Sequence, residues 1–116
     1  MKKEEEILLE DVHAKILSYL DNPQIKPIET VENIKKDFNI KLGSSSDFNH
    51  IRTSVDKYLQ YSTKTSSSNF FNQLYGGFSI TGHIGEMLSS ITNNSMYTYE
   101  MSPVSTLMEI ELVKKM

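Results

Sequence analysis

The chain has 116 residues, no cysteine and a formal net charge of −3, and 38% of its residues are hydrophobic. This length fits one domain or part of one. The absence of cysteine excludes disulfides and thiolate chemistry. No apolar run approaches the roughly 20 residues of a membrane span. The negative charge, the single arginine (Arg52) and a start without a signal peptide predict a soluble, cytoplasmic protein with neither nucleic acid nor membrane as partner.

The first half of the chain predicts three helices. Apolar residues recur every three or four positions over residues 4–20, and Asp21-Asn22-Pro23 should end this helix because the residue before a proline avoids the helical region. Thr30 is placed to cap a short second helix. Residues 44–46, three serines, should open the third. The stripe that we expect this helix to bury consists of Phe48, Ile51, Val55, Tyr58 and Leu59.

The second half predicts two further helices between loops. Residues 62–68 form a polar loop, and residues 93–103 are too irregular for a strand. The helix between these loops carries Ile84, Met87, Leu88 and Ile91 at helical spacing. Ser102-Pro103 is a good start for the last helix, with serine as the cap and proline at the first helical position. Because no stop signal precedes Met116, we expect the chain to end inside this helix.

Residues 69–78, NFFNQLYGGF, crowd three phenylalanines (two of them adjacent), three side-chain amides, a tyrosine and two glycines together. Phe70 and Phe71 cannot both face a core if the stretch is a strand. Asn72 and Gln73 are costly to bury unless their hydrogen bonds are satisfied. The stretch is therefore either a surface turn or the wall of a site in which the amides face a ligand.

The titratable residues form no catalytic or metal-binding motif. The three histidines lack metal-ligand spacing, and the chain contains neither a G-x-S-x-G element nor a phosphate-binding loop. Glu86, Glu100 and Glu109 are isolated carboxylates, which are usually solvated. The residues by themselves predict a mainly helical domain with an amide- and aromatic-rich loop, and they name no function.

Three longer stretches resemble a known family in order and at matching spacing. Residues 61–77, 82–109 and 112–116 resemble the N-terminal part of the group II pyridoxal-phosphate-dependent amino-acid decarboxylases. The shared motifs are F-F-N-Q-L followed by glycine, a G-E pair, an N-T-x-x-[FY]-T-Y-E-x-x-P-V stretch and L-M-E. The resemblance is to the branch of glutamate decarboxylase and cysteine sulfinate decarboxylase.

This resemblance implies a fold and a division of the chain. The expected fold is mainly α: the N-terminal helical segment of a pyridoxal-phosphate-dependent transferase (aspartate-aminotransferase-like, fold type I), without its large α/β cofactor domain. Residues 1–65 would be a helical segment of the dimer-packing type. Residues 66–101 would form the substrate-pocket loop, a helix and an extended stretch, and residues 102–116 the first helix of the cofactor domain.

The resemblance also implies four substrate-binding residues. Gln73 would donate its amide hydrogen bond to the distal acidic group of the substrate, and Tyr75 would shape the pocket. Ser95 and Tyr97 would form another wall. At the positions of Tyr75, Ser95 and Tyr97, cysteine sulfinate decarboxylases have an aromatic residue, serine and tyrosine. Glutamate decarboxylases have serine, asparagine and phenylalanine there. We therefore expect a pocket for a shorter acidic amino acid.

The chain departs from the family pattern at several places. Asn94 stands where threonine is usual, residues 66–69 (SSSN) replace a G-H-P-R-like run, and Phe78-Ser79 replaces L-D. The family also places its Schiff-base lysine after an N-P-H run well downstream, and this chain has no such run. The resemblance thus implies an amino-acid carboxy-lyase by family, with pyridoxal 5'-phosphate and a homodimer in the full-length form. This chain alone would hold no catalytic, cofactor-binding or metal-binding residue and would be inactive.

Two hypotheses stay open. In the first, the chain is an N-terminal fragment of a decarboxylase that acts on a small acidic amino acid (cysteine sulfinate, aspartate or glutamate type). In the second, it is a stand-alone helical interaction module, or a truncated gene remnant, without enzymatic activity. The face formed by Leu107, Met108 and Leu112 would then be its interface.

Overall fold

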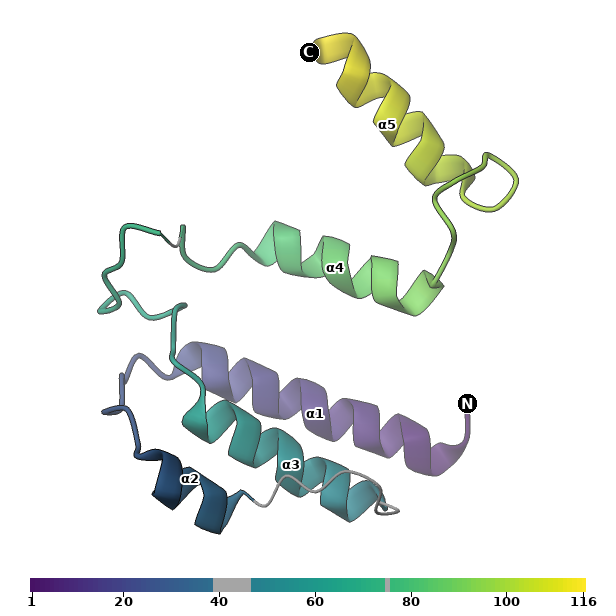
Figure 1. Cartoon of the computed structure of the whole chain (residues 1–116). Coiled ribbons are helices and arrows are strands. Elements are labelled where there is room, and N and C mark those ends of the chain that lie inside the picture. The colour runs from purple at the N-terminus through teal and green to yellow at the C-terminus, as the bar shows by residue number, and fades with distance from the viewer. Residues whose placement is uncertain (39–46, 75) are drawn as a thin grey trace. The chain divides into compact units, whose positions relative to one another are not determined.

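The computed structural model describes residues 1–38, 47–74 and 76–116, and it confirms a mainly α chain (Figure 1). The described residues contain no strand. Their helices are α1 (Lys3–Asp21), α2 (Val31–Asp37), α3 (Phe48–Tyr61), α4 (Ile80–Thr92) and α5 (Pro103–Lys115). The chain divides into two compact units, Met1–Phe78 and Ser79–Met116, and each is described by itself.

The ends of the first two helices follow the signals in the sequence. Glu4, Glu5 and Glu6 lie in the first turn of α1, where the helix dipole favours negative charge. This helix ends at Asp21, as predicted from the proline that follows two residues later. The side chain of Thr30 accepts a hydrogen bond of 3.3 Å from the Asn33 amide, so it is the predicted cap of α2.

The start of α3 is fixed by the residue directly before it. Asp47 caps this helix, because its Oδ1 accepts a hydrogen bond of 2.7 Å from the His50 amide. The three serines predicted to open the helix, residues 44–46, lie outside the described residues.

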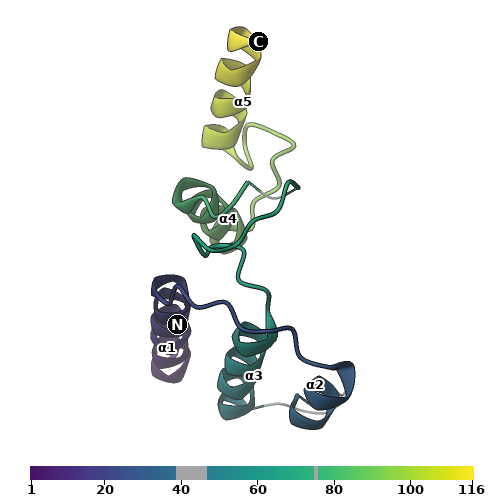
Figure 2. The ribbon, with the colours of Figure 1, turned by 90° about the vertical axis from the view of Figure 1, so that its left-hand side faces the viewer.

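Helices α1 and α3 lie side by side and are the pair of helices that make extensive contact in the first unit (Figure 2). Ion pairs join them: Lys15 Nζ lies 2.6 Å from Asp56 Oδ1, and Arg52 Nε lies 3.4 Å from Asp11 Oδ2. Pairs of this kind at a partly exposed surface contribute about 0–1 kcal/mol each. Charge pairing therefore fixes which faces meet more than it stabilises the contact.

The burial predicted for α3 is wrong. Phe48, Val55 and Leu59 are half-buried, whereas Ile51 and Tyr58 remain 37% and 67% exposed. No described apolar side chain anywhere reaches full burial. Two helices packed on each other cover one side of each, and a closed core needs a further layer.

The second unit contains α4 and α5. Asn93 ends α4 in the left-handed conformation (φ 46°), and its amide donates a hydrogen bond of 3.0 Å to the Ser89 carbonyl. Pro103 is the first residue of α5 and Ser102 precedes it, as predicted, although the Ser102 side chain makes no capping hydrogen bond. No described helix is both long and apolar enough to cross a membrane.

Apolar side chains surround α5 and are exposed. Exposed fractions between 45% and 69% are found for Val104, Leu107, Met108, Ile110, Leu112 and Val113. A helix that is apolar on all sides is typical of a buried position, whereas a surface helix keeps one polar face.

Candidate substrate-binding site

The loop that follows α3 leads directly into the segment predicted to bind substrate. Residues 62–68 have neither helix nor strand structure, which confirms the predicted loop. Its side chains are not all solvated, however: Lys64 is only 6% exposed and Ser67 only 7%. Buried polar groups of this kind need hydrogen-bond partners, and these two find them at the end of α1 or just beyond it.

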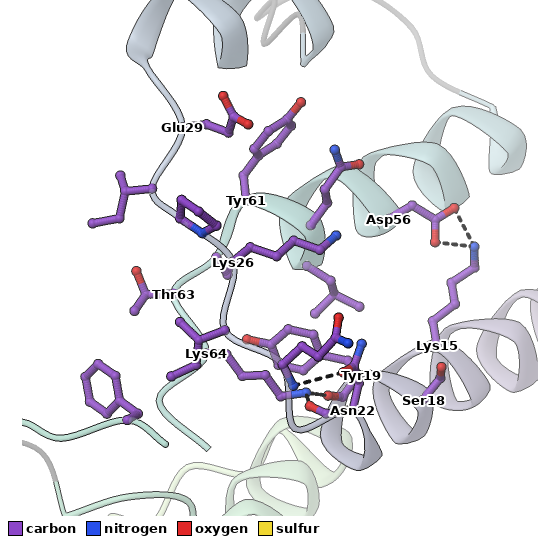
Figure 3. A pocket seen from close by; sticks show the side chains of 18 of the residues that line it. Lys15, Ser18, Tyr19, Asn22, Lys26, Glu29, Asp56, Tyr61, Thr63 and Lys64 are labelled. Atoms are coloured by element: carbon purple, nitrogen blue, oxygen red, sulfur yellow. Dashed lines mark hydrogen bonds and ion pairs between the residues drawn. The ribbon is translucent and has the colours of Figure 1, made fainter. Parts of the chain in front are cut away.

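Lys64 reaches the C-terminal end of α1 (Figure 3). Its Nζ donates hydrogen bonds to the backbone carbonyls of Tyr19 and Asn22 and lies 4.6 Å from the centroid of the Tyr19 ring. The last carbonyls of a helix have no partner within the helix, and that end carries partial negative charge. Since α1 has no basic residue in its own last turn, Lys64 supplies the complementary charge from a distant loop.

Ser67 fixes the loop at a second point. Its Oγ donates a hydrogen bond of 2.8 Å to the Pro23 carbonyl and accepts one of 3.2 Å from the Asn69 amide. The Ser67 carbonyl accepts a hydrogen bond of 3.0 Å from the Phe70 amide. The backbone is therefore held continuously from Lys64 to Phe70.

A pocket of about 920 Å³ opens beside this contact, within the first unit (Figure 3). Phe70 lines it, together with residues of α1, of α3 and of the linker before α2. Burial, together with the neighbouring Tyr58, raises the pKa of Tyr19 above its ordinary value of 10.0. Gln73 does not line this pocket, so the pocket and the predicted substrate-binding residue are separate features.

Gln73 lies in a turn that its neighbour stabilises. Asn72 Oδ1 accepts a hydrogen bond of 2.7 Å from the Leu74 amide, so this amide group folds the backbone and leaves Gln73 exposed at the turn. Phe70 is half-buried and Phe71 is 90% exposed, as expected for two adjacent phenylalanines that cannot share one face. Gly77 follows with φ 83°, a conformation that favours glycine. Tyr75 lies outside the described residues.

Ser95 and Tyr97 lie in the loop between α4 and α5, in the second unit. Both are exposed, and Tyr97 is 93% exposed. Ser95 and Tyr97 thus share one loop of the second unit, whereas Gln73 belongs to the first unit. The four-residue site stays a prediction.

One carboxylate joins α2 to α3. Asp37 accepts hydrogen bonds from Lys57 Nζ and, at 2.5 Å, from the hydroxyl of Tyr61. The bond from Lys57 and then that from Tyr61 lower the pKa of Asp37, and the bond to Asp37 raises the pKa of Tyr61 to about 12. A phenol with this pKa stays neutral near pH 7. The cluster therefore holds two helices together and is no source of a catalytic base.

The described residues contain no cluster of three or more histidines or carboxylates that could hold a metal ion. Glu86, Glu100 and Glu109 are all exposed, as expected for isolated carboxylates. The feature that the sequence did not predict is the buried Lys64. Its only local signal is a lysine within a serine- and threonine-rich loop, and its partners lie 42 and 45 residues earlier in the chain.

Comparison with known proteins decides the family. Residues 31–116 match the model of the pyridoxal-dependent decarboxylase conserved domain. This chain belongs to the pyridoxal-dependent decarboxylase family. The resemblance predicted from the sequence motifs is thereby confirmed, and the chain corresponds to the N-terminal part of a group II decarboxylase.

This chain matches only a small part of individual decarboxylases of the family. The acidic amino acid decarboxylase GADL1 of Xenopus tropicalis is 33% identical over 106 residues, which are 91% of this chain and 19% of that protein. GADL1 of Bos taurus is 34% identical over 86 residues, 73% of this chain and 16% of that protein. Cysteine sulfinic acid decarboxylase of Rattus norvegicus is 43% identical over 58 residues, 50% of this chain and 12% of that protein. The chain spans less than a fifth of these relatives.

A solved decarboxylase structure gives the same fold. The crystal structure of mouse CSAD matches with a TM-score of 0.83 and 30% identity, and it covers 95% of this chain and 24% of that chain. The prediction of an N-terminal helical segment of a pyridoxal-phosphate-dependent enzyme is therefore confirmed.

Proposed function

We propose that this chain works as the N-terminal part of a pyridoxal-phosphate-dependent decarboxylase for a small acidic amino acid. The observation that carries the proposal is the family match over residues 31–116, which includes both predicted pocket segments. The names of the matched relatives, an acidic amino acid decarboxylase and a cysteine sulfinic acid decarboxylase, support an acidic substrate. The chain would contribute substrate-pocket and dimer-interface residues to a cytoplasmic homodimer, and it would not catalyse the reaction alone.

The proposed pocket has two parts. Gln73 donates its side-chain amide to the distal acidic group of the substrate, and its exposed position in a stabilised turn supports this role. Tyr75 limits the length of the substrate. Ser95 and Tyr97 form the second wall. The side chain of Tyr97 is 93% exposed, so its ring is accessible to a ligand.

The cofactor would be held by the rest of the polypeptide. Bound pyridoxal phosphate supplies an electron sink for the carbanion that loss of CO₂ leaves. Lys64 is the buried lysine among the described residues, and its Nζ already donates to two carbonyls. An ammonium group fixed in this way is not available as a nucleophilic amine. We therefore assign Lys64 no role as the Schiff-base lysine.

The proposed divisions of the chain follow from the same family placement. Residues 102–116 would begin the cofactor domain, and the apolar, exposed sides of α5 support burial by further protein. Residues 1–65 would pack at the dimer interface, and the half-buried faces of α1 and α3 support a further layer over them. Residues 66–101 would carry the pocket.

Substrate preference tests the proposed pocket. The full-length decarboxylase should have a higher kcat/KM for cysteine sulfinate than for glutamate, because Tyr75 shortens the pocket. Tyr75→Ser should shift this ratio toward glutamate by about tenfold, the lower end of what one pocket group contributes to discrimination. Steady-state kinetics with both substrates measure it, and Tyr75→Phe, which keeps the aromatic ring, is the matched control. Equal turnover of the two substrates by the unsubstituted enzyme would contradict the proposal.

A further inference from the structure

The loop of residues 62–70 is anchored more firmly than its sequence suggests. Lys64 and Ser67 are two of the three buried polar residues among the described part of the chain, and both bond to backbone carbonyls at the end of α1 or just beyond it. Buried polar side chains persist where their hydrogen bonds are satisfied, and they then fix a unique arrangement. The loop therefore has one defined position on α1.

The anchoring of this loop also constrains Gln73, the predicted substrate-binding residue. The Phe70 amide donates a hydrogen bond to the Ser67 carbonyl, and Phe70 lines the pocket. The next bonded group is Asn72, which closes the turn that contains Gln73. Only Phe71, which is 90% exposed, lies between these two fixed points. The location of Gln73 within the first unit thus depends on the contact that Lys64 and Ser67 make with α1.

We infer that Lys64, together with Ser67, is a positioning residue that holds Gln73 in place through the anchored loop. The inference rests on the proposed function for its consequence on substrate binding, but the anchoring itself is a property of the first unit. Ser67 lies in the SSSN run that replaces the family's G-H-P-R-like run, so this anchoring bond comes from a position at which the chain departs from the family pattern.

Hydrogen exchange tests the anchoring without reference to activity. In the full-length product of the gene, Lys64→Met should speed exchange of the Phe70 and Leu74 amides by at least about tenfold, because two charge-assisted hydrogen bonds are lost. Ser67→Ala should act in the same direction and provides a milder variant if Lys64→Met fails to fold. Lys26→Met is the matched control, since Lys26 is an exposed lysine of the same pocket. Unchanged exchange in the two anchor variants, or unprotected amides before any substitution, would overturn the inference.

Kinetics then separate positioning from a general loss of folded enzyme. Lys64→Met should raise KM for the acidic substrate by about tenfold and change kcat little, and it should have no further effect in the presence of Gln73→Ala. Equal losses for acidic and neutral amino acids, or fully additive effects of the two substitutions, would overturn the positioning role. If Gln73→Ala alone changes nothing while the anchor variants still speed exchange, the assignment of Gln73 fails and the anchoring stands.

Discussion

Replacing Gln73 with alanine should lower kcat/KM for the acidic substrate by about 10- to 100-fold in the full-length decarboxylase. A hydrogen bond to a charged group contributes about 1.5–3 kcal/mol, and each 1.4 kcal/mol corresponds to about tenfold. The side chain that would be lost is exposed in a turn held by Asn72, so truncation should leave the backbone of the turn in place. Steady-state kinetics on purified enzyme measure the effect.

The control for this prediction is Gln60→Ala, which removes an exposed glutamine of α3. It should leave kcat/KM unchanged within about twofold, the usual range for surface substitutions. A Gln73→Ala enzyme that loses activity equally toward acidic and neutral amino acids would show that the residue does not recognise the acidic group.

The second large effect concerns the chain on its own. We expect residues 1–116 in isolation to unfold over a broad temperature range without a cooperative transition, because no described apolar side chain is fully buried. Helices α4 and α5 have 13 residues each, and helices of this length are only marginally stable in water when isolated. Circular dichroism during heating, with hydrogen exchange of the two units, measures this.

The same experiment separates the two hypotheses for the chain. A stand-alone interaction module should melt in one sharp step and remain monodisperse, since an evolved module stabilises its own fold. The apolar sides of α5 would then remain exposed without aggregation. A sharp, reversible melt of the isolated chain would therefore contradict the decarboxylase account.

Local signals explain why the helices were predictable. Thr30 caps α2 by a hydrogen bond to an amide only three residues later. The Asp-Asn-Pro run begins at the last residue of α1, the helix that it ends. Proline at the first position of α5 acts in the same way. Each signal acts within one turn of the chain, so the sequence shows it without knowledge of the fold.

Burial and long-range contacts were not predictable in this way. The α3 stripe was expected to be buried because helical spacing shows which side is apolar, but not whether anything covers it. Lys64 lies in what reads as a polar loop, and only the fold brings it to the Tyr19 carbonyl, 45 residues earlier. The buried Ser67 escaped prediction for the same reason.

The candidate site rests on motif resemblance more than on local physics. Nothing in the charge or spacing of Gln73, Ser95 or Tyr97 marks them as substrate-binding residues, because their partner would be a ligand and not another residue of this chain. The structure adds that all three are exposed and that the amide of the neighbouring Asn72 stabilises the turn. Residues 72–74 thus form a surface turn that carries one candidate ligand-binding amide.

The nucleotide sequence of the transcript beyond codon 116 tests whether this chain is the N-terminal part of a decarboxylase. If the chain is the N-terminal part of a decarboxylase, the reading frame should continue into a long open stretch that encodes an N-P-H-K-like segment. Substrate assays on the full-length protein would then follow. A stop codon directly after codon 116 in the mature transcript would contradict the account, and the interaction module would become the hypothesis to pursue.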